Sequence, residues 1–215
     1  NIGAGKTSLS TKLAEDFNGR LVLERFADNP FLPKFYEHPE RYAFPLELSF
    51  LAERFSQLKQ DLYSRDLFQP FVFADYFISK SMIFAKANLG EEEFELFMRM
   101  FKLMDTQLPR PDLMVYLHLE VDQLQANIKK RGRTYEQQIK DEYLKSIQDS
   151  YFAFIKQHRK LRILIVETAD VDFVNNPKDY QRMIDIVSET YPKGIHRIKA
   201  WGGNNGLLFG YAVLV

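Results

Sequence analysis

The chain has 215 residues, 46% hydrophobic and 27% charged, a composition ordinary for a globular protein with a full core. Its 29 basic and 29 acidic residues balance, which argues against polymeric nucleic acid as a partner. The lack of cysteine excludes disulfides and thiolate chemistry. No apolar run is long enough to span a membrane and no signal peptide is visible, so no membrane partner and a cytoplasmic location are expected.

Short apolar segments alternate with amphipathic helical patterns along the chain. Strands are expected at 20–24, 71–75, 113–118 and 163–167. Helices are expected at 7–17, 45–63, 79–89, 91–107, 141–160 and 178–190, with one more containing Leu124 and Ile128. This alternation predicts an α/β fold in which a parallel sheet is flanked by crossover helices.

A glycine-rich stretch comes directly before the first predicted helix. It reads Asn1, Ile2, Gly3, Ala4, Gly5, Lys6, Thr7, and its end matches the phosphate-binding loop pattern G-x-x-x-x-G-K-[ST]. The opening Gly of the pattern would lie one residue before Asn1. Backbone N–H groups and the helix dipole favour phosphate here, with Lys6 expected on the β- and γ-phosphates of ATP and Thr7 on Mg²⁺. The alternative is a glycine-rich turn with no ligand.

Four stretches together resemble the deoxynucleoside kinases, most closely the bacterial members. They are residues 1–8, Glu24 with 28–32, 35–42 with 44–54, and 130–136 with 142–144. The resemblance runs from Asn1 to about Tyr191. It implies a three-layer P-loop kinase fold with a short lid, ATP-dependent phosphorylation of the 5′-hydroxyl of a deoxynucleoside, and a homodimer.

The resemblance assigns roles to residues of the acceptor site and the lid. Glu24 matches the base near the sugar 5′-hydroxyl, and a carboxylate after a parallel strand does point into the ligand crevice. Tyr36 and Glu136 match residues that contact the 3′-hydroxyl, although a packing role for Tyr36 is an equal alternative. Arg131 and Arg133 match lid arginines that offset triphosphate charge, whereas a charge run alone would indicate only a solvated face.

Glu47 departs from the family, which has a glutamine that pairs with the base. An ionised carboxylate only accepts hydrogen bonds, so Glu47 favours a base with an exocyclic amine, and we expect a purine, with deoxyadenosine preferred. The alternative is a solvated helix face. Arg54, two helical turns on, matches a residue on the base side and is expected to pair with Glu47 or with the base.

A second departure lies at the end of the second predicted strand. Relatives have an acidic–Arg–Ser triplet where this chain has Ala74, Asp75 and Tyr76, so the phosphate-steadying Arg is missing. Asp75 is expected to help hold Mg²⁺, and Lys80 is expected to restore the positive charge near the substrate. The alternative is that phosphoryl transfer is weak or lost.

We assign residues 1–198 to one P-loop domain whose first, central strand is expected to precede the loop and is not seen in this sequence. Residues 199–215 do not resemble the family and receive no role, although a small added strand is possible. Two rival functions stay open: a nucleoside monophosphate kinase of the thymidylate kinase type, and a non-catalytic nucleotide-binding subunit. The apolar stripe from Phe94 to Met104 is expected in the core or at a subunit interface.

Overall fold

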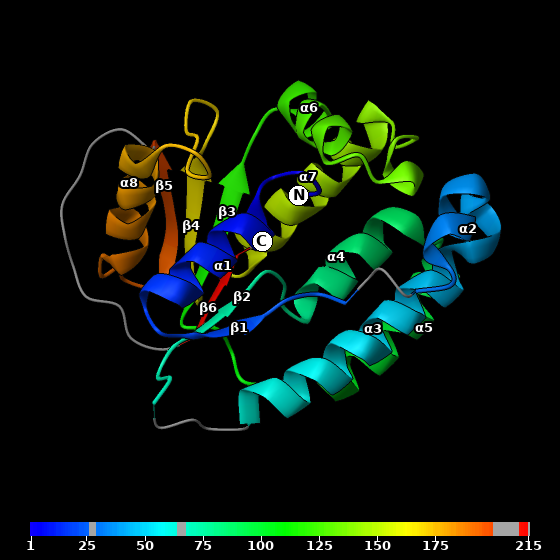
Figure 1. Cartoon of the computed structure of the whole chain (residues 1–215). Helices are drawn as coiled ribbons and strands as arrows, with labels where there is room; N and C mark the ends of the chain where they lie inside the picture. The colour runs from blue at the N-terminus through cyan, green and yellow to red at the C-terminus, as the bar shows by residue number, and fades with distance from the viewer. Residues whose placement is uncertain (26–28, 64–67, 200–210, 215) are drawn as a thin grey trace.

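The computed structural model describes residues 1–25, 29–63, 68–199 and 211–214 (Figure 1). The strands are β1 Arg20–Val22, β2 Val72–Ala74, β3 Leu113–His118, β4 Arg162–Glu167, β5 Gly194–Lys199 and β6 Tyr211–Leu214. The helices are α1 Lys6–Asp16, α2 Leu32–Glu37, α3 Pro39–Tyr63, α4 Ser79–Asn88, α5 Glu91–Asp105, α6 Val121–Arg131, α7 Asp141–Gln157 and α8 Pro177–Ser188. A short 3-10 turn, η1, covers Thr134–Glu136.

The strands form one parallel sheet in the order β1-β2-β6-β3-β4-β5. Alternate residues of β3 divide its two faces: Leu113, Val115 and Leu117 pack with α1, α6 and α8, whereas Met114 and Tyr116 pack with α3, α4, α5 and α7. Because both faces are covered, the strand is buried and largely apolar from Leu113 to Leu117. The predicted α/β fold with a three-layer arrangement is therefore confirmed (Figure 1).

Strand β6 lies in the middle of the sheet, between β2 and β3. Val213 is in register with Ala74 on one side and with Met114 on the other, and its side chain is fully buried. The sequence predicts a central strand before the phosphate loop and leaves open a small added strand within residues 199–215. The described part of that segment does supply a strand, which lies at the centre of the sheet, and β5 ends at Lys199; residues 200–210 lie outside the described residues.

All the strands and helices predicted from the sequence are present, and α2, β5 and β6 are additional. Helix α3 begins at Pro39 rather than at Pro45, which is accommodated inside the helix. The stripe on α5 packs into the core through Phe97 and Phe101. Among the described residues, no helix has both the length and the apolar character needed to cross a membrane.

Candidate active site

The glycine-rich stretch forms a tight loop that leads into α1, next to the carboxyl ends of the strands. Gly3 and Gly5 have φ of 79° and 82°, in the left-handed region that favours glycine. A Cβ at Gly3 would lie 2.8 Å from the Leu124 carbonyl oxygen, and one at Gly5 would lie 2.8 Å from the ring of Phe173. Both positions therefore require glycine for conformation and for space.

The loop is anchored at its start and on the side of α6. The side-chain amide of Asn1 donates to the carbonyl of Leu144 at 3.0 Å, and that of Asn127 donates to the carbonyl of Gly3 at 2.8 Å. Helix α1 begins at Lys6 with no side-chain cap, so its first N–H groups remain available to a phosphate. The geometry is that of a phosphate-binding loop.

Lys6 and Thr7 face the acceptor side of the loop. The ammonium of Lys6 donates to the carbonyl of Asn1 at 2.5 Å, and burial, together with the nearby Lys80, lowers the pKa of Lys6 to about 7. The hydroxyl of Thr7 donates to Oδ2 of Asp75 at 2.5 Å, while Oδ1 of Asp75 accepts from the backbone N–H of Glu24 at 2.9 Å. A hydroxyl and a carboxylate at this distance are a donor set that suits Mg²⁺, which takes hard oxygen ligands.

Two hollows meet at the phosphate loop. The donor cleft lies between the loop, α6 and the segment after β4; its lining residues include Gly3, Ala4, Gly5, Lys6, Thr7, Gln123, Asn127, Arg131, Arg133 and residues 168–169 and 171–175. The acceptor cavity lies on the other side; its lining includes Ile2, Lys6, Thr7, Glu24, Tyr36, Glu47, Arg54, Asp75, Lys80, Phe84, Glu136 and Tyr143. Lys6, Thr7 and the lid arginines border both hollows, so a phosphate held by the loop would face both.

Glu24 is held between two cations in the acceptor cavity. Its Oε2 lies 2.5 Å from Nζ of Lys80, and its Oε1 accepts from Nε of Arg54 at 2.7 Å and lies 2.6 Å from Nη2. Burial raises the pKa of this carboxyl, but Lys80 and Arg54 outweigh that effect and lower the pKa to about 2. Glu24 is therefore ionised at neutral pH, and the cations responsible are Lys80 and Arg54 rather than its exposed neighbour Arg25.

The placement of Arg54 corrects one expectation. Its guanidinium does not pair with Glu47 but with Glu24, and its Nη1 donates to the hydroxyl of Ser81 at 2.7 Å. The two residues share α3, yet the guanidinium of Arg54 reaches the carboxylate of Glu24, which follows β1, in a charge-assisted bond. Lys80 is the second residue of α4 and lies beside Glu24, where the sequence predicts positive charge.

Glu47 is buried at the wall of the acceptor cavity, with 1% of its surface exposed. Its Oε1 accepts from the side-chain amide of Asn88 at 2.6 Å. Burial raises the pKa of Glu47 to about 7, against the opposing effects of Arg54 and of the Asn88 bond. The reading of Glu47 as a solvated helix position is therefore wrong.

The lid residues converge on Glu136, which is buried in η1. Arg131 and Arg133 both pair with its carboxylate. The ring of the neighbouring Tyr135 stacks on Tyr36 of α2 at 6.2 Å between ring centroids. Tyr36 and Glu136 therefore line the same part of the cavity, and burial with the nearby Glu136 raises the pKa of Tyr36.

Several residues of the site were missed from the sequence. Ser81 and Asn88 bond to Arg54 and Glu47, Asn127 holds the phosphate loop, and Phe173 packs against Gly5. Their only sequence signal is position: Ser81 and Asn88 follow the strand-end Asp75 on one helix, and no local pattern distinguishes them from surface residues.

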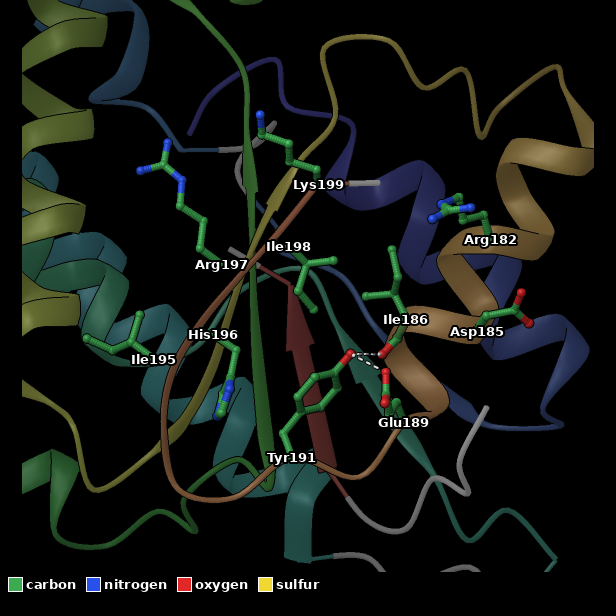
Figure 2. A pocket seen from close by; sticks show the side chains of 10 residues that line it. All are labelled: Arg182, Asp185, Ile186, Glu189, Tyr191, Ile195, His196, Arg197, Ile198 and Lys199. Carbon is green, nitrogen blue, oxygen red and sulfur yellow. Dashed lines mark hydrogen bonds between the residues drawn. The ribbon is translucent and has the colours of Figure 1, made fainter. Parts of the chain in front are cut away.

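A third hollow lies away from this site, between α8 and β5 (Figure 2). In it, the hydroxyl of Tyr191 contacts the carbonyl of Ile186 at 3.0 Å and the carboxylate of Glu189 at 3.2 Å. Arg197 pairs with Glu167. It contains none of the predicted site residues, so the chemistry is assigned to the two hollows at the phosphate loop.

The chain is similar to known proteins of one family. A family model described as deoxynucleoside kinase matches residues 1–191. Deoxyguanosine kinase of Bacillus subtilis (strain 168) is 36% identical, the alignment covering 87% of this chain and 93% of that protein. Deoxyadenosine/deoxycytidine kinase of the same organism is 27% identical, covering 87% and 88%. A solved structure of deoxyadenosine kinase from M. mycoides with bound dATP has the same fold, with a TM-score of 0.74, 21% identity, and coverage of 88% of this chain and 96% of that one.

Proposed function

This chain belongs to the deoxynucleoside kinase family, and we propose that it transfers the γ-phosphate of ATP to the 5′-hydroxyl of a purine deoxynucleoside, with deoxyadenosine preferred. The observation that carries the proposal is the ionised Glu24, held by Lys80 and Arg54 in a cavity that meets a phosphate-binding loop. A carboxylate in that position can orient a hydroxyl and accept its proton as the hydroxyl attacks phosphorus. The product is the deoxynucleoside 5′-monophosphate.

Each part of the loop has a task in this reaction. The N–H groups at the start of α1 bind the β- and γ-phosphates, and Lys6 leaves the carbonyl of Asn1 to bind the same oxygens. Lys80 is assigned the charge-steadying role that an Arg has in relatives, because it lies between Glu24 and the loop and is close enough to lower the pKa of Lys6. Phosphoryl transfer needs mainly such positioning and charge stabilisation.

Mg²⁺ is assigned to Thr7 and Asp75, whose oxygens are the fitting donors described above. When bound, the ion would neutralise phosphate charge as it builds up during transfer. Asp75 also accepts a hydrogen bond from the backbone N–H of Glu24, so the same carboxylate connects the proposed metal position to the proposed catalytic base, Glu24.

The lid and the sugar site complete the assignment. Arg131 and Arg133 are proposed to leave Glu136 for the triphosphate when ATP binds, which releases Glu136 to meet the 3′-hydroxyl together with Tyr36. Glu47 is proposed to contact the base and to favour one with an exocyclic amine.

A rival kinase of nucleoside monophosphates would need cations free to bind the acceptor phosphate. Five basic residues line the described acceptor cavity: Arg54 and Lys80 are both paired with Glu24, and Lys6, Arg131 and Arg133 are assigned to ATP, so none of the five is left for an acceptor phosphate. This favours an uncharged acceptor.

The homodimer and the cytoplasmic location remain part of the proposal. Light scattering tests the first and cell fractionation tests the second.

The deciding experiment measures ADP release by purified protein with ATP, Mg²⁺ and either a deoxynucleoside or its 5′-monophosphate. We expect turnover with deoxyadenosine and none with deoxyadenosine monophosphate. Turnover with the monophosphate alone would establish the rival kinase. Magnesium-dependent ATP binding with no turnover on any deoxynucleoside would establish a non-catalytic subunit.

A further inference from the structure

The carboxyl group of Glu47 presents its two oxygens to different surroundings. Oε1 accepts a hydrogen bond from Nδ2 of Asn88 at 2.6 Å. Oε2 is buried and has no hydrogen-bond partner among the described residues. A buried carboxylate oxygen without a partner is costly, on the order of 1–3 kcal/mol or more. Because Glu47 lines the acceptor cavity, Oε2 is the atom that lacks a bond a ligand donor could supply.

Groups around Glu47 do not compete for Oε2. Arg54, on the same helix, is committed to Glu24 and Ser81, and Lys80 is committed to Glu24. Tyr143 of α7 lines the cavity and hydrogen-bonds to Asn88. The remaining titratable groups that interact electrostatically with Glu47 are Glu24 and Tyr36. The orientation of the carboxyl is therefore set by Asn88.

We propose that Asn88 is a positioning residue for base selection: its amide holds one oxygen of Glu47 and leaves the other as a single hydrogen-bond acceptor facing the base. This inference rests on the proposed function, because it takes the acceptor cavity to hold a deoxynucleoside. An amide N–H₂ can only donate and an ionised carboxylate can only accept, so the polarity of the pair is fixed above pH 7, where Glu47 is mostly ionised, and the test is made at pH 8. A single acceptor matches an exocyclic amine and disfavours a carbonyl at the same ring position.

The hydrogen bond from Asn88 predicts which way an amide at position 47 would turn. In Glu47→Gln, Asn88 still donates and so binds the amide oxygen, which directs the new N–H₂ donor into the cavity. In the double variant Glu47→Gln/Asn88→Asp, the carboxylate at 88 accepts from that N–H₂ and from the hydroxyl of Tyr143. The amide oxygen then faces the cavity, and a single acceptor is restored without a charge on residue 47.

The test compares 2′-deoxyadenosine with 2′-deoxyinosine, which carries a carbonyl oxygen where adenine carries its amine. The ratio of the two is measured for the wild type and both variants, by kcat/KM and independently by calorimetric binding. A ratio on one preparation does not depend on the folded fraction, so partial unfolding of a variant cannot mimic the result. We expect deoxyadenosine to be preferred about tenfold in the wild type, the preference to be lost or reversed in Glu47→Gln, and the double variant to recover it.

The outcomes separate this inference from the proposed function. Equal ratios in the single and double variants, with turnover, would overturn the role of Asn88 and leave the kinase intact. The expected pattern in binding without any turnover would support Asn88 and overturn the phosphotransfer. Failure of both nucleosides to bind the wild type would overturn both.

Discussion

Replacement of Lys80 by Met tests whether this residue supplies the positive charge that relatives obtain from an Arg. The ammonium lies 2.5 Å from Oε2 of Glu24, and both side chains are 10% exposed. The pKa of Glu24 falls from 4.5 to about 2, which corresponds to roughly 3 kcal/mol in favour of the ionised form. Lys80 is the largest of the attractive contributions, ahead of Arg54, so we assign it at least half, or about 2 kcal/mol.

Three consequences follow for Lys80→Met. First, kcat should fall by about 10²-fold, the usual cost of losing one charge-stabilising group at a reacting centre. Second, losing about 2 kcal/mol of that stabilisation should raise the pKa of Glu24 by about 1.5 units, so the acid limb of kcat/KM should move up to roughly pH 3.5. Third, Tm at pH 7 should fall by about 4–8 °C.

The stability effect has a defined sign and pH window. Because the folded-state pKa of Glu24 is depressed, its contribution is present above pH 4.5 and is lost as pH falls toward about 2. The difference in Tm between wild type and variant should therefore narrow at low pH. The control is Lys86→Met on the same helix, whose ammonium is exposed and lies over the ring of Phe94, outside the cavity. A kcat within twofold of wild type with an unchanged pH profile would refute the role of Lys80.

Four further outcomes are expected. Lys6→Ala should abolish turnover in the ADP-release assay, and measurable kcat would remove the loop from catalysis. Glu24→Gln should lower kcat by about 10²- to 10⁴-fold while changing ATP affinity little by calorimetry; an unchanged kcat would remove Glu24 from the base role. Glu47→Gln should raise Tm at pH 8 but not at pH 4. Burial raises the pKa of Glu47 to about 7, so the free-energy cost of ionising the buried carboxyl group grows as pH rises from 4.5. An equal Tm gain at both pH values would contradict this. Val213→Asp should lower the free energy of unfolding, measured with denaturant, by more than about 4 kcal/mol, whereas Val174→Asp at an exposed position should change it little. Equal free energies of unfolding for the two variants would contradict the central position of β6.

The elements that the sequence predicted well have strong local signals. Helix α1 follows a glycine-rich turn, and β3 and β4 are continuous apolar runs bounded by polar residues. The unpredicted elements lack such signals. Helix α2 has only six residues, and β6 is an apolar run whose place in the sheet depends on pairing with Ala74 and Met114, far away in sequence. Local pattern can identify such a run as apolar but cannot choose its neighbours.

The candidate site divides in the same way. The loop, Glu24, Asp75 and the lid follow from motifs, and the structure brings them together around two hollows. What the sequence could not predict is the pairing of charges. Spacing along α3 allowed Arg54 to reach Glu47, whereas packing of α3 against α4 directs it to Glu24 and Ser81. Residues that act through a partner, such as Asn88, become visible only when the partner's contacts are known.

The two buried glutamates of the acceptor cavity show how one pocket can hold two carboxyl groups with different tasks. Glu24 is paired with two cations, and its pKa of about 2 keeps it ionised beside the phosphate loop. Such a carboxylate is a weak base, so in the proposed reaction it would act mainly by orienting the hydroxyl and would take the proton late, which suits a phosphoryl transfer that demands little from the nucleophile. Glu47 has an amide partner instead, and burial raises its pKa to about 7. Opposite pKa shifts of two glutamates indicate separate roles, and here the difference follows from how the charges pair. Arg54 and Lys80 both bind Glu24, and neither is paired with Glu47.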